Sequence, residues 1–369
     1  PSVMEFDVSL DSASMPSLFS QSLETTIIEQ VERQHERFIE AFQASPNGIV
    51  MLDDQDQIEW CNAIAEQFLG LQFKRDALQR IHYIVRKPDF MEYITSRQYD
   101  EPLVLEKMGS NSSLILRLQA FPFSENRRLL LVQDITDLSK AEAMRRDFVA
   151  NVSHEMRTPL TVMMGFLETV QTLDLPPEQK TQYIEMMMDQ GRRMKNLVDD
   201  LLTLANLEAN TQPAPSNRIS MSYLISLIKN DAYALSQGRH TLNFDVKTAC
   251  DLLGEERELL SAFINLVSNA IRYTPELGSI NVSWSINPAG EGEFSVTDTG
   301  PGISPEHIPR LTERFYRIDR SRSRETGGTG LGLAIVKHVA NRHQANLVIE
   351  STPGRGSTFT LRFPPARTS

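Results

Sequence analysis

The chain contains 369 residues and carries a formal net charge of −11 at neutral pH. This length is sufficient for two or three domains that each bury a core. The acidic balance argues against direct binding to nucleic acid, because neutralising phosphates requires a basic surface.

The cysteines and the hydropathy indicate a cytoplasmic compartment for the chain as given. Cys61 and Cys250 lie far apart, so they form neither a disulfide framework nor a metal-binding spacing, which suits a reducing cytosol. No apolar run approaches the roughly 18 residues expected of a membrane span. We also expect no signal peptide, because no basic and apolar leader is legible.

The first 37 residues predict two segments without a core of their own. Residues 1–21 are polar and serine-rich with no period, which predicts disorder. Over residues 22–37 we expect a coiled helix, because apolar residues recur three and four positions apart, a pattern that can form a parallel dimer coil. This seam consists of Ile28, Val31, His35, Phe38 and Phe42.

Residues 38–136 mix short strands and helices. Strands are predicted at 48–52, 58–60, 103–106, 114–120 and 129–134, with a short helix near 62–69. The run NAIAEQFLG at residues 62–70 makes this segment resemble a PAS sensor domain. The sequence identifies no ligand for this domain, since the residues around His82 do not match a haem site and those around Cys61 do not match flavin-linked light sensors. A sensor pocket and a ligand-free positioning and dimerisation module both stay open.

Residues 137–210 predict two long helices joined by a turn at 174–177. Apolar residues of the first helix recur at helical spacing, and His154 lies about 200° around from Val152 and Met156, away from that face. The stripe of the first helix is Phe148, Val152, Met156, Leu160, Met163, Leu167 and Val170. The stripe of the second is Tyr183, Met187, Gly191, Met194, Val198, Leu201 and Ala205. Two helices cannot bury both stripes alone, so we expect an antiparallel hairpin that forms a dimeric four-helix bundle in a homodimer.

The surroundings of His154 suit chemistry on an imidazole. Glu155 can accept a proton from one ring nitrogen and leave the other nucleophilic, although adjacent helix positions do not face each other. Thr158 shares the face of His154 and can orient a water; alternatively it only satisfies a backbone carbonyl. Pro159 cannot donate to the carbonyl of Glu155, so the helix is expected to bend there.

A second motif, NLVSNAIRYTP at residues 265–275, ends a helix predicted to begin after Gly254. Asn265 and Asn269 lie one turn apart on one face, where an amide oxygen can hold Mg²⁺ together with substrate phosphates. Arg272 offers a cation to a phosphate, and Tyr273 offers a ring that can lie beside a base. Taken alone, the motif also fits a surface helix with two solvated asparagines.

Two glycine-rich motifs follow. Asp298, Gly300 and Gly302 come directly after a strand predicted at 293–297; the carboxylate can accept from the exocyclic amine of adenine, and the glycines let backbone pass close to a nucleotide. The run GGTGLGL at residues 327–333 opens a helix whose N-terminal N–H groups form an anion site. It lacks the preceding strand and the later acidic residue of a dinucleotide-binding Rossmann unit.

An arginine-rich segment, residues 310–324, separates the two glycine motifs. Its arginines are Arg310, Arg314, Arg317, Arg320, Arg322 and Arg324. A solvated charged face is the simple interpretation, but the flanking glycines favour a mobile lid over a triphosphate.

These motifs, in this order, resemble the phosphoacceptor, asparagine, glycine and phenylalanine boxes of sensor histidine kinases. The resemblance implies a multidomain α+β protein in which residues 217–365 form an α/β-sandwich, Bergerat-type ATP-binding domain. It implies catalytic roles for His154, Glu155, Thr158 and Arg272, with Asn265 as the Mg²⁺ ligand. The implied nucleotide contacts are Asn265, Asn269, Tyr273, Asp298, Gly300, Gly302, Arg314, Phe315, Tyr316, Arg317, Gly328, Thr329, Gly330, Leu331 and Gly332.

The resemblance further implies an enzyme that uses Mg-ATP to phosphorylate its own His154. The phosphoryl group then passes to an aspartate of a response regulator, which the enzyme also dephosphorylates. A PAS domain directly before the hairpin resembles the phosphate-regulon sensor kinases, so a PhoB-like regulator is the expected partner. Relatives are anchored in the bacterial inner membrane, which adds membrane-associated regulators to the expected partners; either an anchor was removed here or this member is soluble.

Two other classes remain open. A gyrase- or MutL-like ATPase would use the same nucleotide boxes but needs no phosphoacceptor hairpin. A non-catalytic PAS scaffold would keep the hairpin and lose nucleotide residues.

Overall fold

The computed structural model describes residues 30, 34, 37, 39–108, 113–123, 126–210, 212–318 and 328–368. The expectations for the segment 1–21 and for most of the seam lie outside the described residues, as do those for the later part of the lid. The residues concerned include Ile28, Val31, His35, Phe38, Arg320, Arg322, Arg324 and Gly327. The chain folds as two compact units, Pro1–Arg145 and Arg146–Ser369.

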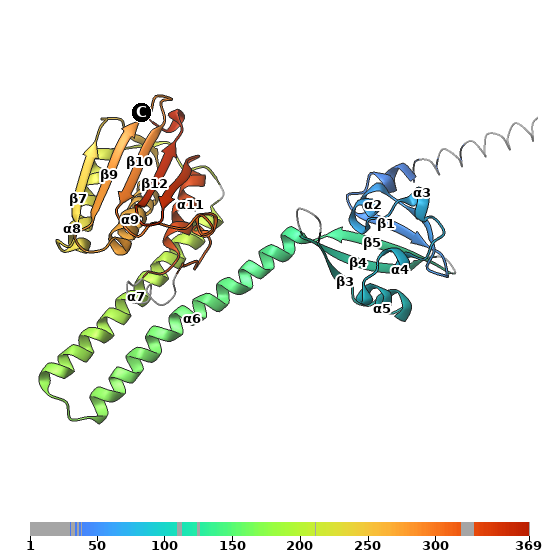
Figure 1. Ribbon diagram of the computed structural model, residues 1–369, viewed down its shortest axis with the longest axis horizontal. Coiled ribbons are helices and arrows are strands. Elements are labelled where there is room, and N and C mark those ends of the chain that lie inside the picture. Colours follow the sequence, from blue (N-terminus) through green and yellow to red (C-terminus); the bar gives the residue numbers. More distant parts are fainter. Residues whose placement is uncertain are drawn as a thin grey trace, which may run out of the picture. The chain divides into compact units, whose positions relative to one another are not determined.

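The first unit is built on a five-stranded antiparallel sheet with the order β2-β1-β5-β4-β3 (Figure 1). Its strands are β1 (Gly48–Leu52), β2 (Ile58–Cys61), β3 (Leu103–Met108), β4 (Ser113–Phe123) and β5 (Arg127–Asp134). Its helices are α2 (Ala63–Leu69), α3 (Phe73–Asp76), α4 (Ile81–Ile84) and α5 (Pro88–Ser96). The predicted strands and α2 are confirmed, whereas α3, α4 and α5 are too short to show a period in the sequence.

Asn62 holds the start of this unit together. Its side-chain oxygen caps α2 by accepting from the backbone N–H of Ala65 at 3.0 Å, and it also accepts from the N–H of Ile49 at 2.9 Å. Its amide nitrogen donates to the carbonyls of Phe42 and Asn47. An N-cap asparagine satisfies helix N–H groups that have no intrahelical partner. One buried side chain thus joins a strand, a helix and the preceding segment.

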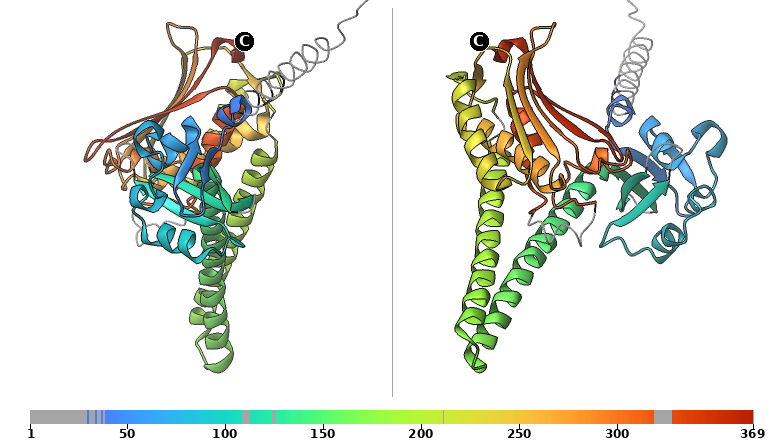
Figure 2. Two further views of the ribbon diagram at one scale, coloured as in Figure 1. Left: turned by 90° about the vertical axis from the view of Figure 1, so that its right-hand side faces the viewer. Right: turned by 60° about the vertical axis from the view of Figure 1, so that its left-hand side comes forward.

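The hairpin consists of α6 (Thr136–Thr172) and α7 (Pro177–Ala209), which confirms both predicted helices and the turn. The two helices meet at the turn and diverge away from it (Figure 1 and Figure 2). The α6 helix continues through Pro159 without a break. Neither helix, nor any other in the described part of the chain, is long and apolar enough to cross a membrane.

The rest of the second unit is a mixed five-stranded sheet covered by helices. The strand order is β11-β12-β10-β9-β7, and only the β7–β9 pair is parallel among these neighbours. The strands are β7 (Thr241–Val246), β9 (Ser279–Ile286), β10 (Gly292–Asp298), β11 (Asn346–Thr352) and β12 (Gly356–Phe363), and a separate pair is β6 (Asn217–Ile219) with β8 (Leu252–Gly254). The helices are α8 (Met221–Ser236), α9 (Glu256–Tyr273) and α11 (Gly332–Arg342), and two short 3₁₀ turns are η1 (Ile308–Arg310) and η2 (Pro365–Arg367).

Alternation along β10 decides which sheet face is covered. Phe294 and Val296 are fully buried under the helices, and Phe263 of α9 stacks on Phe294 with ring centroids 4.0 Å apart. The intervening Ser295 and Thr297 pair their hydroxyls with threonines of β12. The period of two therefore places helices on one face and hydroxyl ladders on the other.

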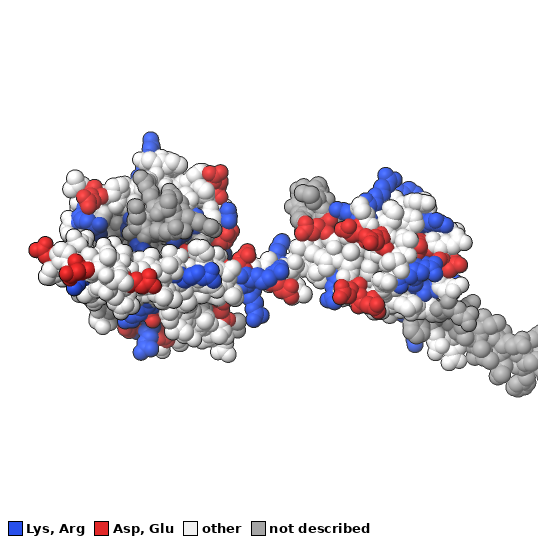
Figure 3. Space-filling model, turned by 90° about the horizontal axis from the view of Figure 1, so that it is seen from below, with Lys and Arg blue, Asp and Glu red and all other residues white. Residues whose placement is uncertain are grey.

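The hairpin shares a core with the sheet domain. Leu197, Leu204 and Leu207 of α7 are buried within the same hydrophobic cluster as α9 and α11, and Phe148 and Met156 of α6 pack against it. This packing brings the helix that carries His154 to the sheet domain. The face drawn in Figure 3 carries charges of both signs separated by uncharged stretches, so the acidic surplus is not gathered into one patch there.

Candidate active site

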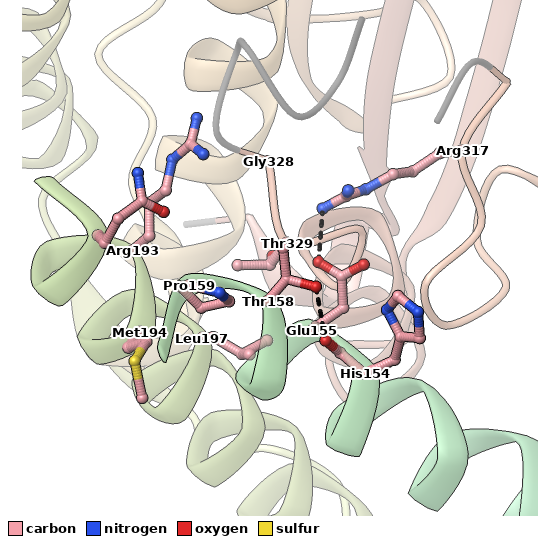
Figure 4. A pocket seen from close by; sticks show the side chains of 11 residues that line it. His154, Glu155, Thr158, Pro159, Arg193, Met194, Leu197, Arg317, Gly328 and Thr329 are labelled. Atoms are coloured by element: carbon pink, nitrogen blue, oxygen red, sulfur yellow. Dashed lines mark hydrogen bonds and ion pairs between the residues drawn. The ribbon is translucent and has the colours of Figure 1, made fainter. Parts of the chain in front are cut away.

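His154 lines a pocket of about 70 Å³ between the hairpin and the sheet domain (Figure 4). The hairpin contributes His154, Glu155 and Thr158 of α6 together with Arg193 of α7. The sheet domain contributes Arg317, Gly328 and Thr329. Two motifs more than 160 residues apart in the sequence therefore meet in one pocket.

The two neighbours of His154 have partners of their own. The Glu155 carboxylate faces Arg317, with 3.8 Å between oxygen and guanidinium nitrogen (Figure 4). The Thr158 hydroxyl donates to the carbonyl of His154 at 3.2 Å. The imidazole itself is on the exposed side of α6, as the sequence predicts. The roles of Glu155 as a base and Thr158 in orienting water stay predictions.

Asn265 presents its amide oxygen to the start of α11. The amide nitrogen donates to the carbonyl of Ser261 at 3.0 Å, which fixes the side chain. A Cβ on Gly332 would overlap the Asn265 oxygen, so only glycine leaves room there. Mg²⁺ takes hard oxygen ligands and usually keeps waters and substrate phosphates, and an amide oxygen on this half-buried side chain is a ligand of that kind. Among the described residues no group of three or more His, Cys, Asp or Glu side chains forms a metal site.

Asp298 is buried at the end of β10, and the two glycines that follow it are closely packed. One carboxylate oxygen accepts from the N–H of Gly300 at 2.7 Å, and burial raises the pKa of this carboxyl above its usual range. A Cβ on Gly300 would lie 2.7 Å from the same oxygen. Gly302 adopts φ +70°, where any Cβ would overlap the carbonyl of Thr352. The glycines are thus required by close backbone approach.

The side chains of the phenylalanine box contact two different parts of the protein, the hairpin and the sheet domain. Arg314 forms an ion pair with Glu208 of α7, and Phe315, at φ +60°, lies against Phe148 of α6 with ring centroids 5.8 Å apart. Tyr316 stays in its own domain, where its hydroxyl contacts the Nδ1 of His307 at 2.8 Å. The structure therefore places Arg314 and Phe315 against the hairpin, although the resemblance implies nucleotide contacts for both.

The second glycine box is attached to the hairpin through Asp200. The Thr329 hydroxyl donates to the Asp200 carboxylate at 2.7 Å and also accepts from the N–H of Leu331 at 3.3 Å. Burial is the main cause that raises the pKa of Asp200. Arg272 lies against Gly328, where a Cβ would come within 3.1 Å of its guanidinium. Arg272 therefore borders Gly328, which lines the pocket that holds His154, although Arg272 is not itself among the residues that line it. Its catalytic role stays a prediction.

The remaining predicted residues lie around these groups. Asn269 is half-buried one turn beyond Asn265, and Tyr273 is 48% exposed at the end of α9. Gly330 adopts φ +73°, and Leu331 is fully buried.

Three family models match the chain. They are the histidine kinase-, DNA gyrase B- and HSP90-like ATPases over residues 254–367, the His Kinase A (phospho-acceptor) domain over 144–210, and the PAS domain over 36–97. The chain is 46% identical over 336 residues to the phosphate regulon sensor protein PhoR of Pseudomonas aeruginosa, which covers 90% of this chain and 75% of that protein. The chain belongs to the PhoR-type sensor histidine kinases.

The chain is similar to further histidine kinases. PhoR of Haemophilus influenzae is 34% identical over 319 residues, which cover 86% of this chain and 74% of that protein. Among solved structures, the histidine kinase ThkA in complex with the response regulator protein TrrA is 21% identical with a TM-score of 0.48, covering 86% of this chain and 95% of that one. The chain contains a phospho-acceptor domain in addition to the ATPase domain. This confirms the prediction of a histidine kinase and not that of a gyrase- or MutL-like ATPase.

Local sequence patterns do not reveal Arg193, Asp200 or Glu208 as site residues. All three lie on α7, whose other polar side chains are mostly exposed. Asp199 and Asp200 form a charged pair beside the apolar stripe, but a single helix gives no means to tell a solvated carboxylate from one that is buried by another domain.

Proposed function

We propose that this protein transfers the γ-phosphoryl group of Mg-ATP to His154 and then to an aspartate of a response regulator. The observation that carries the proposal is the shared pocket of His154 and the Gly328–Thr329 backbone. Backbone N–H groups at a glycine-rich helix start bind phosphate, so the acceptor imidazole lies beside the place where a terminal phosphate is expected. The site residues assigned from the family motifs fit this reaction, with Asn265 holding Mg²⁺ and Asp298 accepting from adenine.

The chemistry at His154 follows from the residues present. A lone pair on one nitrogen of the neutral imidazole forms the N–P bond while the bond from phosphorus to the bridging oxygen breaks, leaving its electron pair on ADP. The proton on the other ring nitrogen leaves through Glu155 or water. Glu155 keeps a second carboxylate oxygen for this proton, because its ion pair with Arg317 involves one oxygen at 3.8 Å.

The test is labelling of the full chain with γ-labelled ATP and MgCl₂. His154→Gln should abolish an acid-labile label while nucleotide binding is kept, because acceptor and nucleotide residues lie on different elements. Ser153→Ala is the matched control, since this neighbouring hydroxyl only donates to the carbonyl of Val149. Label at wild-type level in His154→Gln would contradict the assignment.

We further propose that the protein acts as a homodimer. Many large apolar side chains of the hairpin are exposed in the single chain, which leaves a surface that a second hairpin can cover. They include Val149, Leu160, Met164, Leu167, Ile184, Met188 and Leu202. Light scattering of the full chain at micromolar concentration should give twice the chain mass, and a stable monomer would refute the proposal.

We propose phosphate-regulon signalling as the cellular role, because both curated relatives described above are named for it. The partner would be a PhoB-like response regulator, which the protein would also dephosphorylate, with membrane-associated proteins as further regulators. Label on His154 should pass to the receiver aspartate of a purified PhoB-like regulator within minutes. Transfer no faster than to a receiver from an unrelated system would contradict this role.

A further inference from the structure

The pocket around His154 contains an arginine for which the reaction above has no role. Arg193 of α7 lines the pocket together with His154 and Arg317 (Figure 4). The pocket volume of about 70 Å³ is several times the roughly 10–15 Å³ that one water requires. The space between these side chains can therefore hold a group of phosphoryl size.

Arg193 belongs to a cluster of three arginines from three different elements. Arg272 comes from α9, and Arg317 comes from the segment after η1. Burial is the main cause that lowers the pKa of Arg272, and the positive charges of Arg317 and Arg193 lower it further. Glu155 faces Arg317, and the charge of Asp200 acts on Arg272 in the opposite sense, so charged groups of both signs border the three arginines.

Such a cluster is expected to hold an anion. Like charges close together in a partly dry site repel each other more strongly than in water, and an anion placed among them removes the repulsion. The arginines also border both parts of the reaction site, the glycine box that is expected to bind phosphate and the helix that carries His154. Arg272 contacts Gly328 of the phosphate-binding box, Arg317 faces Glu155, and Arg193 approaches from the helix opposite His154.

We propose that Arg193 is a further catalytic residue, whose guanidinium contacts the γ-phosphoryl group as it moves to His154. This inference rests on the proposed function. Phosphoryl transfer passes through a loose transition state with charge on the three equatorial oxygens, so catalysis is mainly positioning and electrostatic stabilisation. Arg193 would neutralise that charge from the acceptor side. The bonds that form and break are those given above, and Arg193 keeps its proton throughout.

The neighbouring residue supplies a matched control. Arg192 has a 68% exposed side chain and pairs with Asp189 at 2.9 Å, and it does not line the pocket. The variants Arg193→Gln and Arg192→Gln therefore remove the same charge one position apart on the same helix. Arg193→Lys keeps the charge but loses the planar fork, and it should recover part of the rate.

The experiment measures single-turnover phosphorylation of His154 by saturating γ-labelled Mg-ATP in the full chain. Arg193→Gln should slow this step roughly 100-fold, the usual effect of removing one donor from a transition-state site. Arg192→Gln should remain within about twofold of wild type. The reverse reaction, in which phospho-His154 and ADP form ATP, should slow by the same factor because it passes through the same transition state. Affinity for ADP, which lacks the γ-phosphate, should not change.

Three results would separate the interpretations. Equal rates in Arg193→Gln and Arg192→Gln would overturn the inference and leave the proposed function intact. A parallel loss of ADP affinity or of the thermal unfolding midpoint in Arg193→Gln would also overturn it, because Arg193 would then act only through the fold. Wild-type protein without label on His154 would instead refute the proposed function, and the inference with it.

Discussion

His343 predicts an acid-sensitive ATP-binding domain. This residue directly follows α11 and is fully buried. Its Nε2 accepts from the backbone N–H of Glu255 at 3.1 Å, and its Nδ1 lies 2.9 Å from the carbonyl of Val339, to which it donates. The first contact requires the neutral ring, because a protonated imidazole donates from both nitrogens and Nε2 could no longer accept. Burial lowers the pKa of His343 from 6.5 to about 4, and the nearby charges of Arg367 and Arg342 also lower it.

The sign of the effect follows from proton uptake. Between pH 6.5 and 4 the unfolded chain binds a proton at this position and the folded chain does not, so acid favours unfolding. Stability from this group is complete above pH 6.5 and decreases as pH falls toward 4. With these two pKa values the loss at pH 5 is about 2 kcal/mol. No discount for solvent screening applies, because the ring is fully buried.

Urea unfolding of the full chain between pH 7 and pH 5 measures this loss. Trp284 is fully buried in the core of the ATP-binding domain, so its fluorescence reports that domain once Trp60 is replaced by phenylalanine. In that background His343→Gln should remove about 2 kcal/mol of the pH dependence. Carboxyls remote from His343 remain in both proteins and cancel in the comparison. Glu258, whose carboxylate lies 3.9 Å from the Nδ1 of His343, is replaced by glutamine in both proteins. An identical pH dependence with and without His343 would refute the reasoning.

Three further outcomes test the site. Gly332→Ala should weaken Mg-ATP binding at least 10-fold, because the new Cβ overlaps the Asn265 amide oxygen. Gly165→Ala is the control and should leave Mg-ATP binding unchanged, because a Cβ there meets nothing within 4 Å. Equal titration curves for the two variants would contradict the assigned contact. Asp298→Asn should weaken ADP and ATP equally, by roughly 10-fold or more, since a charged hydrogen bond to adenine is lost; unchanged ADP affinity in calorimetry would exclude that contact. Thr158→Ala should leave phosphorylation of His154 nearly intact and slow dephosphorylation of the regulator; parallel losses would mean that its hydroxyl only satisfies the backbone carbonyl.

The sequence by itself determined the local parts of this protein. Helical spacing placed His154 outside the apolar stripe of α6, and alternation predicted β10 with Asp298 at its end. These features depend on residues a few positions apart, and their geometry follows from the periods of helix and strand. The helices α3, α4 and α5 were not predicted, because each is short. The region 217–253 was not predicted either, although the buried residues Met221, Leu224 and Ile228 of α8 recur at helical spacing.

Only the tertiary structure decided which parts meet. Three leucines of α7 are buried with the sheet domain, and this packing places Arg193 in the pocket with His154 and Asp200 against Thr329. It also turns Arg314 and Phe315 of the phenylalanine box toward the hairpin. Each of these contacts joins residues far apart in the chain, and long-range pairs depend on how preformed surfaces fit together, which no local spacing records.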